Sequence, residues 1–164
     1  MINFGYDQNG ALSSVGINAK MNEFEAAMGL AILDDIELIM TNYRKVSETY
    51  DELLVQILRR QKILHGCHYN HSYFPVLFPS EETLLKTTER LNKVDVFPRR
   101  YFFPSLDSVK AYKSQQICEV SRDIASRILC LPLYADLELK DVERISKTIN
   151  GKSHIKKSKF FSFR

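Results

Sequence analysis

Four potential metal ligands lie close together in the segment 65–71. They are His65, Cys67, His68 and His71. Imidazole and thiolate are ligands that Zn²⁺ favours in proteins, so the segment has the composition of a zinc site. Its spacing matches none of the usual two-pair arrangements, and such residues in a loop after a long helix are usually solvated. We therefore predict a solvated loop that holds no metal.

A second candidate is a basic turn between two prolines. Arg99, Arg100 and Tyr101 lie between Pro98 and Pro104. Two guanidinium groups on a rigid turn offer paired N–H donors that fit a phosphate or a carboxylate. From the residues alone, an anion-binding turn and a solvated turn are equal alternatives.

The short motifs of common catalytic sites are absent from this sequence. It has no Gly-rich phosphate loop, no His-Glu-x-x-His, no Gly-x-Ser-x-Gly and no calcium-binding loop. Cys118 falls in a helical pattern and Cys130 in an apolar run, and no base is adjacent to either, so both are expected to be core thiols. Spacing alone therefore establishes no catalytic activity.

Composition restricts the classes of protein further. The chain has 164 residues, 45% of them hydrophobic, with three cysteines. This is enough for one globular core, and no apolar run is long enough to cross a bilayer. The first residues lack the basic segment and apolar run of a signal peptide, and three scattered cysteines make no disulfide framework. We expect a cytoplasmic protein without a membrane partner.

The net charge of +3 belongs to the C-terminal tail. Residues 152–164 carry five basic residues and no acidic one, which leaves 18 basic against 20 acidic residues, a net charge of −2, in the rest. Basic residues beside Phe160, Phe161 and Phe163 could contact a nucleic acid or a membrane surface. Termini commonly acquire such residues while disordered, and we expect a disordered tail and no nucleic-acid partner.

The element that leads into the basic turn is a long helix. Asn22-Glu23-Phe24-Glu25 has the capping-box pattern, and only Gly29 interrupts the helical pattern over residues 22–60. Along its second part an apolar stripe recurs at spacings of three and four: Ile36, Ile39, Tyr43, Val46, Tyr50, Leu53 and Ile57. Such a stripe favours packing on a sheet or a partner subunit over a free coiled coil.

Shorter elements follow the long helix. Residues 73–78 and 94–97 are predicted strands, and residues 129–134 a short buried extended segment. Helices are predicted over three ranges: 80–92, 115–129 and 137–150, with Gly151 just past the last. The second of these would bury Ile117, Val120, Ile124 and Ile128. The prediction is an α+β fold, in which a long helix precedes a small sheet with flanking helices.

Residues 16–30, Gly-Ile-Asn-Ala-Lys-Met-Asn-Glu-Phe-Glu-Ala-Ala-Met-Gly-Leu, resemble a segment of the DegT/DnrJ/EryC1/StrS family. That family segment has Gly-x-Asn, then a basic residue and Met, then an acidic residue and a small-residue helical turn. Further similar stretches follow in the family's order: residues 3–5, 72–78, 100–106 and 126–134. The resemblance covers residues 2 to about 150.

The resemblance implies a fold and a division of the chain. The family consists of pyridoxal-phosphate (PLP)-dependent aminotransferases of fold type I that act on nucleotide-linked keto sugars. Residues 1–20 would be the trailing end of the large PLP domain, and residues 21–151 the C-terminal small domain with its long leading helix. Residues 152–164 would be the basic tail.

The resemblance also implies site residues. Asn18 and Lys20 match the positions that bind the phosphate of the partner subunit's PLP in a homodimer. An amide N–H and a cation suit a phosphate dianion, and Lys20 stands where Arg is commoner in the family. Arg100 and Tyr101 would lie beside the entrance for the nucleotide-sugar substrate.

The family's catalytic groups have no counterpart here. Its Schiff-base lysine, the aspartate that pairs with the pyridinium nitrogen and the ring-stacking aromatic lie in the large domain, and none of the thirteen lysines of this chain has similar surroundings. We expect a C-terminal fragment, from a truncated or split reading frame, that binds no PLP and is inactive alone. The complete enzyme would transfer an amino group, from glutamate, to a nucleotide-linked keto-deoxysugar for surface-polysaccharide biosynthesis. The alternative is a non-catalytic module that docks onto a large-domain chain or a full-length paralogue.

Overall fold

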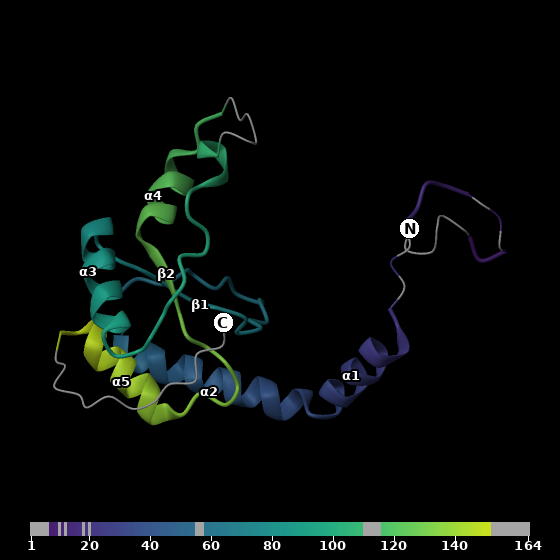
Figure 1. Cartoon of the computed structure of the whole chain (residues 1–164), viewed down its shortest axis with the longest axis horizontal. Coiled ribbons are helices and arrows are strands. Elements are labelled where there is room, and N and C mark those ends of the chain that lie inside the picture. Colours follow the sequence, from purple (N-terminus) through teal and green to yellow (C-terminus); the bar gives the residue numbers. More distant parts are fainter. Residues whose placement is uncertain are drawn as a thin grey trace. The chain divides into compact units, whose positions relative to one another are not determined.

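The computed structural model describes residues 7–9, 11, 13–17, 19, 21–54, 58–109 and 116–151. The chain divides into two compact units, residues 1–38 and 39–164 (Figure 1).

Helix α1 (Glu23–Asp34) begins at the predicted capping box. The Asn22 side chain accepts a hydrogen bond from the Glu25 backbone N–H at 2.9 Å, and the Glu25 carboxylate accepts one from the Asn22 N–H at 3.1 Å. No residue of α1 is buried.

The single helix predicted over residues 22–60 is wrong in two respects: the structure has two helices there, and the second ends at Leu54, with Arg59 in a β-bridge. α1 ends at Asp34, Asp35 forms a turn whose N–H donates to the Ile32 carbonyl at 3.2 Å, and α2 (Ile36–Leu54) follows. Asp is a poor helix former in a helix interior, and two occur in succession at the break.

Helix α2 buries a stripe that differs slightly from the predicted one. Val46 and Tyr50 are buried as expected, but Leu54 is buried in place of Leu53, which is 37% exposed. The buried residues Val46, Tyr50 and Leu54 are spaced four positions apart. Packing against the core decides which of the two adjacent leucines is buried. Ile57 lies outside the described residues.

The strands β1 (Phe74–Leu77) and β2 (Ile128–Leu131) pair antiparallel, with Phe74 opposite Leu131 and Leu77 opposite Ile128. This confirms the strand predicted at 73–78 and the start of the extended segment at 129–134. Isolated bridges join Arg59 to Leu77 and Arg99 to Cys130. The N–H and C=O of Leu77 pair with Arg59, on the side of β1 away from β2. Pro75 has the same orientation, so its missing N–H costs the β1–β2 ladder no hydrogen bond.

Two predictions beside the sheet are wrong. Residues 94–97 form no strand: the N–H groups of Val94 and Val96 both donate to the Leu91 carbonyl, which makes a turn after α3, and pairing with β2 comes only at Arg99. Helix α4 (Glu119–Arg127) is shorter than predicted and buries Ala125. Ile117 and Val120 are 63% and 78% exposed, and Ile128 belongs to β2.

The remaining helices agree with the sequence. α3 (Glu81–Asn92) begins at Ser80, whose hydroxyl accepts from the Thr83 N–H at 3.2 Å. α5 (Leu139–Ile149) is followed by Gly151 at φ +72°, a backbone conformation that glycine adopts without a Cβ penalty.

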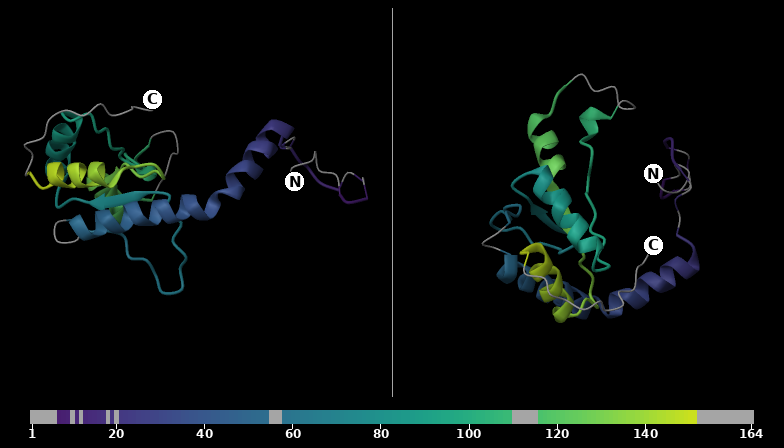
Figure 2. Two further views of the ribbon diagram at one scale, coloured as in Figure 1. Left: turned by 90° about the horizontal axis from the view of Figure 1, so that it is seen from below. Right: turned by 60° about the vertical axis from the view of Figure 1, so that its left-hand side comes forward.

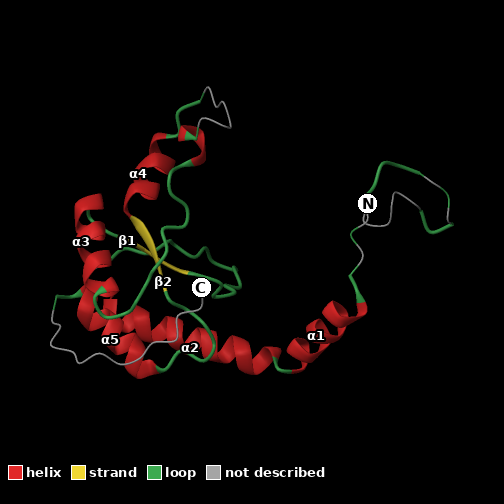
Figure 3. Cartoon of the chain, in the orientation of Figure 1, coloured by secondary structure: helices red, strands yellow, loops and turns green. Residues whose placement is uncertain are grey.

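One core joins three helices to the sheet within residues 39–164 (Figures 2 and 3). The fully buried Tyr50 ring of α2 lies 4.8 Å from the Phe74 ring of β1. α3 and α5 contact each other, and Arg90 donates to the Ile149 carbonyl at 3.2 Å. Further core residues are Val46, Leu54, Val76, Leu84, Leu91, Leu129, Leu131, Val142 and Ile145.

Two adjacent leucines of α3 test this core. Leu84 is fully buried and Leu85 is 46% exposed. Leu84→Ala is expected to lower the free energy of unfolding by about 2–5 kcal/mol, because it leaves a cavity, and Leu85→Ala by less than about 0.5 kcal/mol. Urea denaturation followed by circular dichroism measures both. Equal losses in the two variants would contradict the assignment of the core.

Candidate functional site

Two cavities flank the turn of residues 97–106, and Tyr101 lines both of them. The first, which we call the apolar cavity, has a volume of about 950 Å³ and lies between this turn and α4. The second, which we call the tyrosine pocket, has a volume of about 720 Å³ and lies between the turn and residues 130–136. The turn contains two cis peptide bonds, Tyr101–Phe102 and Phe103–Pro104.

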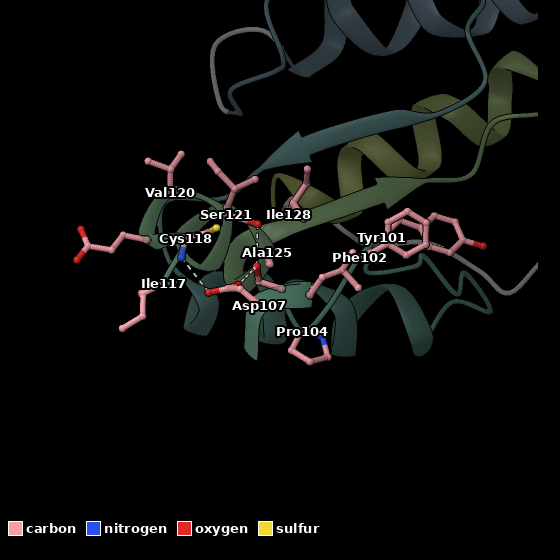
Figure 4. Close-up of a pocket in the computed structure, with 14 residues that line it drawn as sticks. Tyr101, Phe102, Pro104, Asp107, Ile117, Cys118, Val120, Ser121, Ala125 and Ile128 are labelled. Atoms are coloured by element: carbon pink, nitrogen blue, oxygen red, sulfur yellow. Dashed lines mark hydrogen bonds between the residues drawn. The ribbon is translucent and has the colours of Figure 1, made fainter. Parts of the chain in front are cut away.

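The apolar cavity is lined mainly by side chains that solvent reaches (Figure 4). Phe102 and Leu106 of the turn are 71% and 63% exposed, and Val120 of α4 is 78% exposed. Figure 4 shows Tyr101 at one end of this set of side chains and Ile117, Cys118 and Val120 at the other. Ile117 and Val120, which the sequence predicted to be buried, are exposed side chains that line this cavity.

A single carboxylate connects the floor of this cavity to α4. Asp107 belongs to the short helix η1 (Leu106–Ser108), and its side chain is 5% exposed. It accepts hydrogen bonds from the Cys118 backbone N–H at 2.9 Å, the Ser105 hydroxyl at 2.5 Å and the Arg122 Nε–H at 2.7 Å. These donors, the Cys118 N–H above all, lower the pKa of Asp107 to about 2.

The tyrosine pocket combines aromatic rings with charged groups. The rings of Tyr73 and Tyr101 meet edge to face, with centroids 5.4 Å apart. Arg99 Nη1 donates to the Tyr101 hydroxyl at 3.0 Å. Asp95 and Asp136 also line the pocket. Arg99 is anchored through its backbone, which exchanges two hydrogen bonds with Cys130 of β2.

Two groups of this pocket have raised pKa values. Burial raises the pKa of the Tyr134 phenol, and the nearby carboxylates of Asp141 and Asp136 raise it further. Burial also raises the pKa of the Cys130 thiol. Both groups are therefore neutral at physiological pH, and Cys130 is a buried thiol as predicted.

The predicted site residues fall in different places. Arg100 lines neither cavity: its guanidinium donates to Glu81 at 2.7 Å and to the Ser126 carbonyl at 2.6 Å, and it lies 3.7 Å from the centre of the Phe103 ring. Tyr101 lines both cavities. Asn18 and Lys20 lie outside the described residues, so a PLP-phosphate site at these positions stays a prediction.

The lysines of the described residues do not fit a covalent PLP site. All six, at positions 45, 62, 86, 93, 140 and 147, are exposed, and none lines the two cavities. Lys86, Lys140 and Lys147 are paired with glutamates on their own helices or beside them. A lysine that attacks a carbonyl at neutral pH needs a lowered pKa, which burial or a neighbouring cation supplies.

The structure also bears on the other residues that the sequence singled out. Residues 65–71 form a loop, and within the described residues no three His, Cys, Asp or Glu side chains converge on a position for a metal ion. Cys118 is exposed at the N-terminus of α4, so its prediction as a core thiol is wrong. The part of the chain that the structure describes contains no helix long and apolar enough to span a bilayer. The tail 152–164 lies outside that part.

Sequence reasoning missed the groups that shape both cavities. Asp107 and Arg122 are fifteen residues apart, and Tyr73 and Tyr101 are twenty-eight apart, so no short motif relates them. The one usable signal was the density of aromatic residues around Arg99 and Arg100, which drew attention to the turn itself.

Comparison with protein families gives a match over nearly the whole chain. The family model described as the DegT/DnrJ/EryC1/StrS aminotransferase family matches residues 1–150. A protein of Shigella dysenteriae named dTDP-4-amino-4,6-dideoxy-D-glucose transaminase is 33% identical over 159 residues, which are 90% of this chain and 42% of that protein. An Escherichia coli protein of the same name is 31% identical over 160 residues, which are 92% of this chain and 43% of that protein. The chain thus spans less than half the length of these relatives.

Solved structures agree with that match. A Bacillus cereus protein described as a putative PLP-dependent aminotransferase superposes with a TM-score of 0.79 at 29% identity, over 92% of this chain and 42% of the other. DesI, solved in the presence of its TDP-sugar product, gives a TM-score of 0.73 at 28% identity, over 92% and 41%. A Brucella abortus family member gives 0.78 at 21% identity, over 91% and 40%, a likeness of fold alone. The predicted α+β fold is confirmed.

The titration of Asp107 tests the geometry of the apolar cavity. Its pKa of about 2 lies below the usual value for Asp, so the carboxylate favours the folded chain above about pH 4, and this contribution is lost as the pH falls toward 2. A carboxyl ¹³C NMR titration is expected to give a midpoint near 2 for Asp107. Asp107→Asn is expected to remove this titration and to shift the Cys118 amide resonance. A midpoint near 4 in the unsubstituted chain would show that the three hydrogen bonds do not form.

Proposed function

Because this chain belongs to the DegT/DnrJ/EryC1/StrS aminotransferase family, we propose that it is the C-terminal part of a PLP-dependent transaminase that acts on a nucleotide-linked keto-deoxysugar. The observation that carries the proposal is the likeness to two proteins named as transaminases of a dTDP-linked dideoxysugar, which runs through about nine-tenths of the chain. In this proposal the amino donor is glutamate, and the reaction serves surface-polysaccharide biosynthesis in the cytoplasm.

The proposal assigns a part to each stretch of the chain. Residues 1–20 are the trailing end of the large PLP domain, residues 21–151 form the C-terminal small domain, and residues 152–164 are a basic tail. In the homodimer of the complete enzyme, Asn18 and Lys20 bind the phosphate of the partner subunit's PLP. A lysine ammonium is a strong partner for a phosphate dianion, because charge-assisted hydrogen bonds exceed neutral ones.

The turn of residues 97–106 supplies the substrate contacts in this proposal. Tyr101 lines both cavities, and its hydroxyl accepts from Arg99, so it is well placed to meet a ligand in either one. Arg100 contributes by holding the turn against Glu81 and Ser126. A contact of Arg100 with the nucleotide-sugar would use its other N–H donors, because Nη2 makes both of these bonds.

PLP, when bound, supplies an electron sink for the carbon that gains or loses the amino group. The described residues include no lysine suited to hold it covalently, so in this proposal the covalent attachment and the proton transfer belong to the rest of the enzyme. The 164 residues by themselves bind no PLP covalently and do not transaminate. This chain binds the cofactor's phosphate and shapes the substrate entrance.

A second candidate function is favoured by the surface of α1. Its apolar side chains lie on all sides of the helix, and Phe24, Met28 and Leu33 are 90%, 68% and 60% exposed. A helix that is apolar all round is normally buried. The second candidate is therefore a non-catalytic module that docks α1 onto a large-domain chain or a full-length paralogue.

The first test concerns PLP attachment. The purified chain, incubated with PLP and reduced with borohydride, is expected to show no covalent adduct by intact-mass spectrometry, because none of the lysines that the structure describes is buried. The full-length Shigella relative, treated in parallel, serves as the positive control. An adduct on the 164-residue chain would contradict the prediction.

The second test uses a chimera in which this chain replaces the corresponding part of the Shigella relative. Lys20→Ala is expected to weaken PLP binding roughly 10-fold or more, because it removes a charge-assisted hydrogen bond. Lys20→Arg is expected to keep the affinity, because it keeps the charge. Lys93→Ala, at an exposed lysine of the other unit, is the matched control. Fluorescence titration with PLP measures all three.

The chimera also separates the two candidate functions. Amino transfer from glutamate to a dTDP-linked keto-deoxysugar supports the transaminase. A chimera that folds and dimerises but transfers no amino group supports the docking module. Unchanged PLP affinity in Lys20→Ala would remove the proposed phosphate contact.

A further inference from the structure

We infer that the tyrosine pocket binds the nucleoside end of the nucleotide-sugar, with the base stacked on aromatic rings and the diphosphate directed toward Arg99. This inference rests on the proposed function and assigns one part of its substrate to one cavity. The residues that carry it are Tyr73, Asp95, Phe97, Arg99, Tyr101 and Asp136.

The aromatic rings of the pocket face solvent. Tyr73 is 52% exposed, Phe97 59% and Tyr134 41%, and all three line the same cavity as Tyr101. The edge-to-face contact of Tyr73 with Tyr101 fixes both rings. Exposed rings gathered in one cavity form a platform for a planar ligand, and stacking on aromatic side chains is how proteins commonly hold an unpaired base.

The charges of the pocket decide which part of the nucleotide-sugar fits. Asp95 and Asp136 contribute two negative charges and Arg99 one positive charge, so the lining carries a net charge of −1. A diphosphate between two carboxylates would be repelled. A neutral nucleoside suits them, because its imide N–H or sugar O–H groups donate to carboxylate oxygens.

Arg99 gives the ligand a direction. It is the one cation among the residues that line the pocket, it is exposed, and its Nη1 is bonded to the Tyr101 hydroxyl. A guanidinium has five N–H donors, so this bond leaves others for a phosphate oxygen. A nucleoside stacked beside Tyr101 would therefore place its first phosphate at the Arg99 side of the pocket.

The walls of the pocket are held by the core. Asp95, at φ +58°, lies in the turn that follows α3, where its N–H donates to the Asn92 carbonyl at 3.2 Å. The buried Arg144 of α5 donates to the neighbouring Val94 carbonyl at 2.9 Å. The opposite wall continues from β2. A volume of about 720 Å³ lies within the range of preformed small-molecule pockets.

The test is an NMR titration of the ¹⁵N-labelled 164-residue chain with three probes: thymidine, inorganic pyrophosphate and the 6-deoxyhexose L-fucose. Thymidine is expected to shift amide resonances of residues 95–101 and 130–136, pyrophosphate to shift at most those next to Arg99, and L-fucose to leave all of them unchanged. Phe97→Ala is expected to weaken thymidine binding at least about five-fold, through the lost stacking. Phe102→Ala is the matched control, since Phe102 is an exposed ring of the same turn that lines the apolar cavity instead.

Several results would overturn the assignment. The first is no response to thymidine at about 10 mM, a concentration at which a single stacked base still gives measurable occupancy. The second is a response confined to the apolar cavity. The third is binding of pyrophosphate or L-fucose in the tyrosine pocket in place of thymidine. Spectra of Phe97→Ala that match the unsubstituted chain away from the pocket verify its fold.

Kinetics of the chimera separate this inference from the function on which it rests. An active chimera in which Phe97→Ala leaves KM for the dTDP-sugar unchanged overturns the pocket and leaves the transaminase standing. A chimera inactive with every nucleotide-sugar overturns the transaminase, and the thymidine titration then decides the pocket by itself.

Discussion

The guanidinium of Arg100 is the interaction on which the candidate site depends. It joins the turn of residues 97–106 to Glu81 in the first turn of α3 and to the Ser126 carbonyl near the end of α4. Both contacts agree with the helix dipoles, since an acid is favoured at a helix N-terminus and a cation at a C-terminus. The Phe103 ring covers the guanidinium, whose side chain is 21% exposed. Because both cavities open beside this turn, one side chain fixes the wall that they share.

The parts of the fold that could be predicted from the sequence are those whose causes are local. The caps at Asn22 and Ser80 are hydrogen bonds across three residues, and Gly151 follows from one backbone angle. Such contacts involve only residues that a short pattern contains. The errors arise where a distant contact chooses between two local options. Leu54 replaces Leu53 because the core lies on its side of α2, and residues 94–97 turn back onto Leu91 although their composition suits a strand.

The candidate site was less predictable than the fold, for the same reason. The pairing of arginines with aromatic residues identified the turn, but not that Arg100 is engaged within the chain while Tyr101 faces both cavities. The sequence did not identify Asp107 as a site residue, because two of its three hydrogen-bond donors come from residues eleven and fifteen positions later. The assignment of Asn18 and Lys20 came from the family resemblance alone, since an amide and a lysine two residues apart have no specific chemistry of their own.

Helix α1 has its local stabilising contacts, but within the described residues it buries no side chain against the rest of the chain. Its capping box is complete, yet a cap contributes about 1 kcal/mol and an isolated helix of 12 residues is marginal in water. Helices of this length in proteins owe most of their stability to a packed apolar face, and within the described residues α1 has no buried side chain. Its apolar residues surround the axis, so a single contact surface would leave some of them in water. The sequence of α1 therefore suits burial on more than one side, as when a helix lies between two domains or two subunits. This need for burial follows from the apolar side chains of α1 and not from the family resemblance. Under either candidate function, transaminase or docking module, α1 therefore needs another protein surface to cover it.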